Sequence, residues 1–192
     1  MDANQVAARQ ALNEIEQAVA QTRRAIAAGI AAPILMLWGV LWAGAFAATY
    51  AWPGRGGLAW LVADGLGMVG MAAICWRLRR RAAVRSEAAR RLGRRLFWFW
   101  FLLFAYGFVW LRLLEPQREG QIEAFIVVLV MFAYVVMGLW LESGFLMGLG
   151  LVVTALTMAG YFLLGTAFDL WMAITGGGAL FASGLYMRWK WR

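Results

Sequence analysis

Four charged residues lie within or directly beside long apolar stretches of the chain: Asp64, Arg112, Glu123 and Asp169. Asp64 is the deepest of them, because it lies inside the apolar segment LVADGLGMVGMAAIC. A carboxylate in apolar surroundings can bind a cation or exchange a proton. Because burying its charge in lipid costs free energy, such a residue is taken by default as a candidate functional site. We therefore predict that these four residues form a candidate intramembrane polar site, with Asp64 at its centre.

The relation between Asp64 and Arg112 has two interpretations. In the functional one, Asp64 titrates during proton or cation coupling, while Arg112 and Glu123 set its charge environment. In the structural one, Arg112 forms an ion pair that holds helix ends together, or it anchors among lipid headgroups. Small residues at helical steps from Asp64, such as Gly67, predict that its side chain points toward another helix.

Other kinds of chemistry have few residues to support them. The chain has no histidine and a single cysteine, Cys75, which removes the commonest zinc and haem ligands and any disulfide framework. The glycine run at 176–178 lacks the lysine of a phosphate-binding loop. We therefore predict no catalytic site, no metal site and no cofactor, and we expect that the protein is not an enzyme.

Composition indicates what must position the polar site. Apolar residues make up 64% of the 192 residues, against roughly 45–50% in soluble domains. A helix crosses the hydrocarbon core of a bilayer, roughly 30 Å thick, with about 20 residues. We predict an all-α, polytopic membrane protein in which six transmembrane helices form one compact bundle. The predicted spans are 29–52, 57–76, 96–114, 122–141, 145–164 and 170–187.

Basic residues indicate the orientation of this bundle. Nine of the 18 Lys and Arg residues lie in one segment between the second and third predicted spans. They are Arg77, Arg79, Arg80, Arg81, Arg85, Arg90, Arg91, Arg94 and Arg95. With six spans, this segment and both termini share a side that holds 15 of the 18 basic residues, so we predict that this side is cytoplasmic.

The basic segment also suggests what the protein contacts. We expect it to contact anionic lipid headgroups, and the dominance of arginine in an Ala- and Gly-rich chain suggests a bacterial inner membrane. The net charge of +8 would suggest nucleic acid in a soluble protein. Because the positive charges are distributed by membrane side, we expect no nucleic-acid partner.

Residues 1–26 differ from the spans and form the first of two predicted units, with residues 27–192 as the transmembrane domain. Leu12, Ile15, Val19 and Ile26 recur at helical spacing among polar residues, which predicts an amphipathic cytoplasmic helix. This helix either lies on the inner leaflet or serves as an arm for a partner or a second copy.

Glycines predict where helices approach closely. Gly144 and Gly148 form a GxxxG pattern in the fifth span, and Gly176, Gly177 and Gly178 interrupt the sixth. Each glycine costs a helix about 1 kcal/mol relative to alanine, so a packing role is expected to offset that cost. We predict that the fifth span packs on the sixth, or that two copies pack here. The alternative is a broken helix that lines a substrate site.

The tail GGGALFASGLYMRWKWR and the segment ALNEIEQAVAQTRRAIAAG resemble small, uncharacterised six-helix proteins of bacterial inner membranes. This resemblance implies a fold and carries over no functional residues. Together these features predict an integral membrane protein that acts through interaction, as a scaffold, regulatory or accessory subunit, with a protein partner or a second copy. The alternative is a small proton- or cation-coupled transporter or channel with Asp64 in its site.

Overall fold

The computed structural model describes residues 9–14, 27–81, 87–116 and 120–190, and these are helical apart from short turns. Residues 9–14 are helical and belong to the predicted amphipathic helix, whose other residues up to 26 lie outside the described part. The remaining elements are η1 (Ala27–Ala31), α2 (Ala32–Ala51), α3 (Gly56–Arg81), α4 (Glu87–Leu114), α5 (Gln121–Trp140), α6 (Gly144–Leu163), η2 (Gly165–Ala167), α7 (Phe168–Met172), η3 (Ala173–Gly177) and α8 (Gly178–Lys190).

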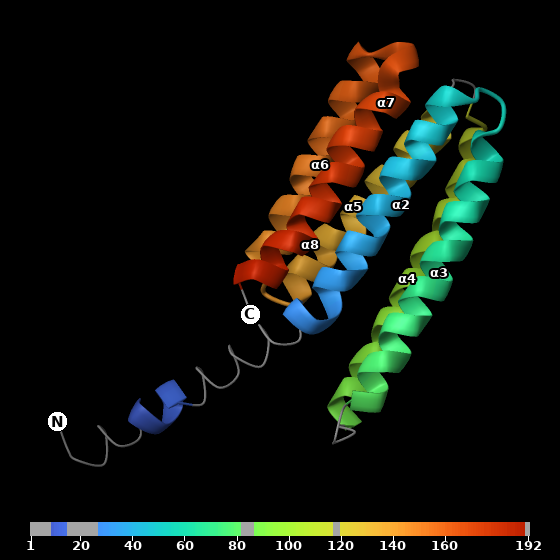
Figure 1. Ribbon diagram of the computed structural model, residues 1–192. Helices are drawn as coiled ribbons and strands as arrows, with labels where there is room; N and C mark the ends of the chain where they lie inside the picture. The colour runs from blue at the N-terminus through green and yellow to red at the C-terminus, as the bar shows by residue number, and fades with distance from the viewer. Residues whose placement is uncertain (1–8, 15–26, 82–86, 117–119, 191–192) are drawn as a thin grey trace.

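Six helices are long and apolar enough to cross a membrane. They span Gly29–Ala51, Gly56–Leu78, Arg90–Leu114, Gln121–Trp140, Gly144–Leu163 and Gly165–Lys190. The predicted number of long apolar helices is confirmed, and each of the six overlaps one predicted span. The helices α3 and α4 continue beyond the predicted spans, into the basic segment, because Arg and Ala are good helix formers. Their shared end projects beyond the other helices (Figure 1).

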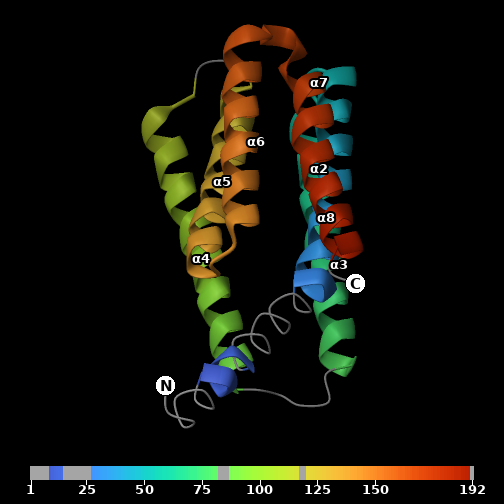
Figure 2. The same ribbon diagram turned by 90° about the vertical axis from the view of Figure 1, so that its left-hand side faces the viewer.

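The helices fall into two groups that lie side by side. In Figure 2, α4, α5 and α6 form one group, and α2, α3, α7 and α8 form the other. The consecutive helices α2 and α3 pack on each other, as do α5 and α6, and α8 packs most extensively on α2. Fully buried side chains from both groups, including Phe46, Met131, Val153 and Met172, join them into one core.

The fifth span packs on the sixth as expected, but the glycine run makes its close approach to another helix. A Cβ atom on Gly177 would lie 2.6 Å from the backbone nitrogen of Ala43 in α2, so this glycine permits close approach to α2 rather than to α6. Gly39 of α2 lies at the same contact from the other side, because a Cβ atom on it would lie 2.5 Å from the backbone nitrogen of Phe181. The other two glycines differ: Gly176 faces Met172 of its own helical segment, and Gly178 faces open space.

Among the described residues, nothing forms the predicted GxxxG contact of the fifth span. Cβ atoms on Gly144 and Gly148 would meet nothing within 4 Å. The buried stripe of α6 instead runs through Leu149, Gly150 and Val153. Two residues turn a helix by about 200°, so Gly148 faces away from the contact that Gly150 makes.

The last span is irregular, as its glycine content suggested. It begins with a 3₁₀ turn at Gly165, whose φ is +51°, and contains a π-helical turn at Ala173–Gly177. The Trp171 indole donates a 2.9 Å hydrogen bond to the carbonyl of Leu156 in α6, and its ring packs where Gly160 has no side chain. The π-helical turn packs against α2.

The helices α3 and α4 have little cover from their own chain. Within the most apolar window of each span, 11% of α3 and 6% of α4 is buried, whereas the other four spans reach 28–39%. The helix α4 contacts α5 at two places. Gly107 lies against the side chain of Leu129, and the ring of Trp100 lies edge-on to that of Tyr134. The two consecutive helices α3 and α4 share no extensive contact, and each presents a wide apolar surface.

Candidate functional site

Asp64 lies on an exposed side of α3, contrary to the expectation that it points into a helix contact. The face of α3 toward α2 carries Ala63, Gly67 and Gly70. A Cβ atom on Gly67 would lie 2.5 Å from the ring of Trp38, so this glycine does permit close packing. The prediction was wrong because successive residues point about 100° apart around the helix, and Ala63 occupies the contact face.

The depth of Asp64 within its span is nevertheless as the sequence suggested. Asp64 lies eight positions after Gly56, the first residue of α3, which places it about 12 Å along the helix axis. Its exposed neighbours are Leu61 and Met68, whose side chains are 70% and 59% exposed. No hydrogen bond or ion pair joins Asp64 to another residue in the part of the chain that the structure describes.

The other three predicted site residues lie at helix ends. Arg112 is exposed in the last turn of α4, while Glu123 and Asp169 are half-buried in the first turns of α5 and α7. The start of α5 contacts α7, because Gly120 lies against the ring of Phe168. The start of α5, which carries Glu123, therefore lies near the start of α7, which carries Asp169, whereas α3 and α4 share no extensive contact that would bring Arg112 to Asp64.

An aromatic cluster fills the core one turn from Asp64. The ring of Trp60 lies edge-on to Phe46 at 4.8 Å between centroids and to Trp42 at 6.3 Å. Phe168 meets Phe46 at 6.2 Å and Tyr161 at 6.0 Å, so the cluster joins α2, α3, α6 and α7. Asp64 therefore borders the outside of the bundle rather than an internal cavity on this side.

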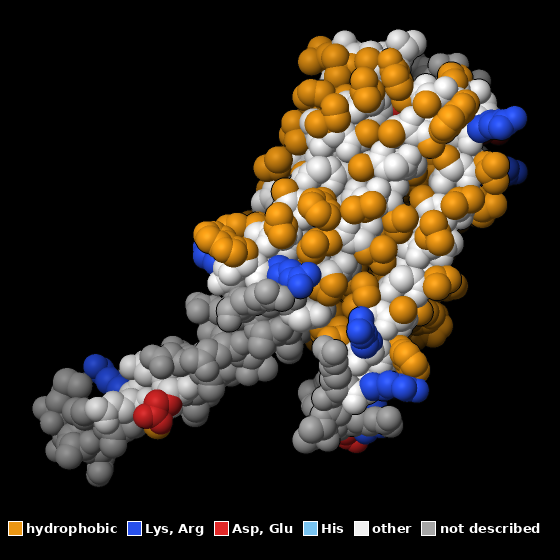
Figure 3. Space-filling view, in the orientation of Figure 1, with side chains coloured by type: hydrophobic (Ala, Val, Ile, Leu, Met, Phe, Trp, Pro, Cys, Tyr) orange, Lys and Arg blue, Asp and Glu red, His pale blue; other side chains and the backbone are white. Residues whose placement is uncertain are grey.

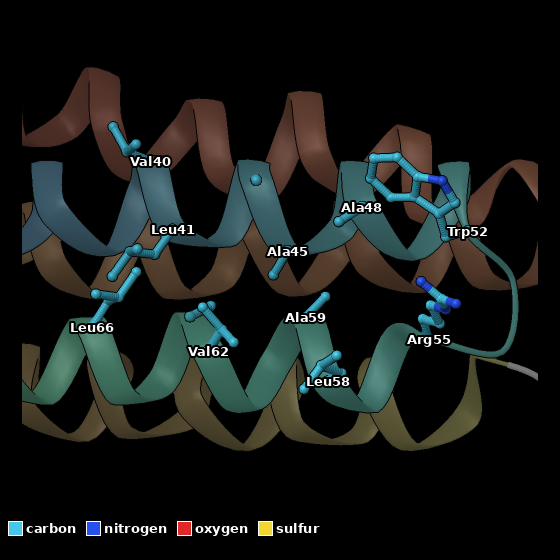
Figure 4. Close-up of a pocket in the computed structure, with 12 residues that line it drawn as sticks. Val40, Leu41, Ala45, Ala48, Trp52, Arg55, Leu58, Ala59, Val62 and Leu66 are labelled. Atoms are coloured by element: carbon cyan, nitrogen blue, oxygen red, sulfur yellow. The ribbon is translucent and has the colours of Figure 1, made fainter.

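A groove of about 520 Å³ runs between α2 and α3 on another side of α3 (Figure 4). Its walls are apolar, and Trp52 and Arg55 lie at one end, where the two helices connect. This groove was not among the features predicted from the sequence. The available signal was the set of small residues that face each other across the hairpin: Gly44, Ala45, Ala48 and Ala59.

The basic cluster is helical where it is described. The α3 helix carries Arg77, Arg79, Arg80 and Arg81, the α4 helix carries Arg90, Arg91, Arg94 and Arg95, and Arg85 lies outside the described residues. The Arg80 guanidinium lies 3.7 Å above the Trp76 ring. A second, smaller pocket brings Arg77 near Arg188, and two guanidinium groups together favour an anion such as a lipid phosphate.

These features define a class of protein. Six helices of this length and composition, with apolar side chains covering their outer surfaces, are the mark of a multi-pass membrane protein. Within the described ranges, no group of three or more His, Cys, Asp or Glu side chains is arranged to hold a metal ion. No protein-family model, curated protein or solved structure matches the chain. Its function must therefore be inferred from its own residues.

Proposed function

We propose that this protein acts in a membrane through lateral interaction with another membrane protein, as a scaffold, regulatory or accessory subunit. The partner covers the side of α3 that carries Asp64. It is not an enzyme in this proposal, and it needs no cofactor. One observation carries the proposal: a carboxylate lies on the exposed surface of a candidate span, about 12 Å from the start of the helix, with no partner among the described residues of its own chain.

The energetic argument starts from the cost of this carboxylate. An aspartate at the centre of a transmembrane helix costs about 2.5–3.5 kcal/mol on the scale of membrane insertion. Such residues face a bundle interior or water and pair with other groups. The core beside Asp64 is filled by the aromatic cluster around Trp60, so a compensating donor or cation is best supplied from outside the chain.

The low burial of α3 and α4 supports the same proposal. Lipid alone can cover an apolar helix, but it offers a mid-span carboxylate neither a donor nor a cation. A partner helix with an arginine, a lysine or a hydrogen-bond donor level with Asp64 would cover the apolar surface and also pair with the carboxylate.

The orientation belongs to the proposal as well. On the face shown in Figure 3, apolar side chains cover the middle of the bundle, and most Lys and Arg side chains gather toward the end at which α3 finishes and α4 begins. We infer that this end is cytoplasmic in a bacterial inner membrane and contacts anionic headgroups. Asp64 then lies in the outer half of the bilayer.

Site-specific photo-crosslinking tests the proposal. A photoreactive residue at Leu61 or Met68, beside Asp64, is expected to give an adduct of one defined mass, whereas one at Val69 gives none. Asp64→Asn should reduce the adduct about tenfold, which corresponds to a loss of about 1.4 kcal/mol in association. A second copy as partner appears as twice the chain mass. Adduct that is equally strong from Val69, or unchanged by Asp64→Asn, contradicts the proposal.

A proton- or cation-coupled transporter or channel is the second candidate function, and the same exposed carboxylate favours it. In that case Asp64 exchanges a proton or binds a cation from water between the helices. Asp64→Asn should then abolish proton or cation flux in liposomes that contain only this protein, while Glu123→Gln keeps the flux. Flux that survives Asp64→Asn removes this candidate.

A further inference from the structure

We propose that the groove between α2 and α3 binds one acyl chain of an anionic phospholipid, with the lipid phosphate at Arg55. This inference rests on the proposed membrane location but not on the proposed protein partner. The groove lies on a different side of α3 from Asp64, so the two sites can be tested separately.

The groove exists because the facing positions of the hairpin carry small side chains. Ala45 and Ala48 of α2 lie across from Ala59 of α3 along its middle (Figure 4), and Gly44 also lines it, so the two helices leave a channel that their own side chains do not fill. Larger residues, Leu41 and Leu66, approach each other at the far end and close it. A channel with apolar walls and one closed end suits a flexible hydrocarbon chain.

The length of the groove matches one leaflet. Its α2 wall extends from Val40 to Trp52, the residue that caps the end of α2, which is twelve steps along the chain or about 18 Å of helix. One leaflet contributes half of the roughly 30 Å hydrocarbon core, or about 15 Å. An acyl chain that enters at the connection between the helices therefore reaches the closed end near the middle of the bilayer.

The open end of the groove has the chemistry of a headgroup site. The Arg55 side chain extends from the start of α3 across the groove toward α2, beside Trp52 (Figure 4). In the described part of the chain, the Arg55 guanidinium has no hydrogen bond or ion pair. An indole prefers the headgroup level, and a guanidinium binds phosphate with two parallel hydrogen bonds. The occupant is therefore expected to carry a phosphate above its chain.

Filling the groove tests the acyl-chain site. Gly44 lines the groove and has nothing within 4 Å of a Cβ atom, so Gly44→Leu adds a bulky side chain at the groove wall where its Cβ atom meets no neighbour. The matched control is Gly65→Leu, which has equal space on the side of α3 away from α2. Native mass spectrometry with dipalmitoyl phosphatidylglycerol should show one tightly bound lipid per wild-type chain. Gly44→Leu should weaken this binding about tenfold, and Gly65→Leu should leave it unchanged.

Replacing the cation tests the headgroup site. Arg55→Gln should remove the preference for phosphatidylglycerol over phosphatidylcholine with the same chains, whereas Arg55→Lys, which keeps the charge but loses the two parallel hydrogen bonds, should keep only part of it. The proposal is overturned if Gly44→Leu binds lipid like the wild type, or if both glycine variants lose it equally. If the wild-type chain binds no lipid while the crosslink beside Asp64 persists, the lipid site is rejected and the proposed function stands. If carbonate washing releases the protein from membranes, the protein is not an integral membrane protein and both proposals are rejected.

Discussion

Gly39→Ala is expected to lower the free energy of unfolding by about 2 kcal/mol, because the added methyl group meets backbone rather than a movable side chain. Its Cβ would lie 2.5 Å from the nitrogen of Phe181 and 2.8 Å from the carbonyl oxygen of Gly177. No rotation of a side chain relieves such contacts, so α2 and α8 must separate. Their separation loosens the buried contacts of Phe46 and Leu180 in the core.

The matched control for Gly39→Ala lies on the same helix. Gly44→Ala adds the same methyl group where nothing lies within 4 Å, and the better helix propensity of alanine should raise stability by roughly 0.5–1 kcal/mol. Unfolding in mild detergent, titrated with a denaturing detergent, measures both variants. Equal midpoints for Gly39→Ala and Gly44→Ala would show that α2 and α8 do not cross as described.

Gly150→Ala is expected to have a similar effect in the other group of helices, a loss of about 2 kcal/mol in the free energy of unfolding. Its Cβ would lie 2.7 Å from the carbonyl oxygen of Met131 and 2.8 Å from a methyl group of Val135, both in α5. The carbonyl cannot move without disturbing its own helix. The hairpin of α5 and α6 should therefore open at its middle.

Gly148→Ala serves as the control for Gly150→Ala and separates the sequence prediction from the structure. Gly148 belongs to the GxxxG pattern that predicted a close helix contact, yet nothing lies within 4 Å of its Cβ position. The same unfolding titration should show a neutral or slightly stabilising change. If Gly148→Ala destabilises the protein as much as Gly150→Ala does, a second copy packs on that face.

The predicted site was only partly recoverable from sequence. The depth of Asp64 follows from counting residues along α3, and its cost follows from the apolar residues around it. Its direction did not follow, because apolar residues surround the whole helix and leave no periodic signal for the buried face. The small residues Gly67 and Gly70 do lie on the contact face of α3, but Asp64 lies to one side of that face around the helix axis.

The sequence by itself determined that the chain forms six long apolar helices, which part of the chain each one occupies, and how the positive charges divide along it. Backbone groups in lipid must be satisfied within each span, so a continuous apolar run of sufficient length specifies a helix without reference to its neighbours. Only the tertiary structure decided that α8 packs on α2, that Gly150 rather than Gly148 lies in a contact, and that a groove stays open between α2 and α3. These features depend on the rotation of each helix about its axis. Packing between particular side chains sets that rotation, and hydropathy alone carries no information about it.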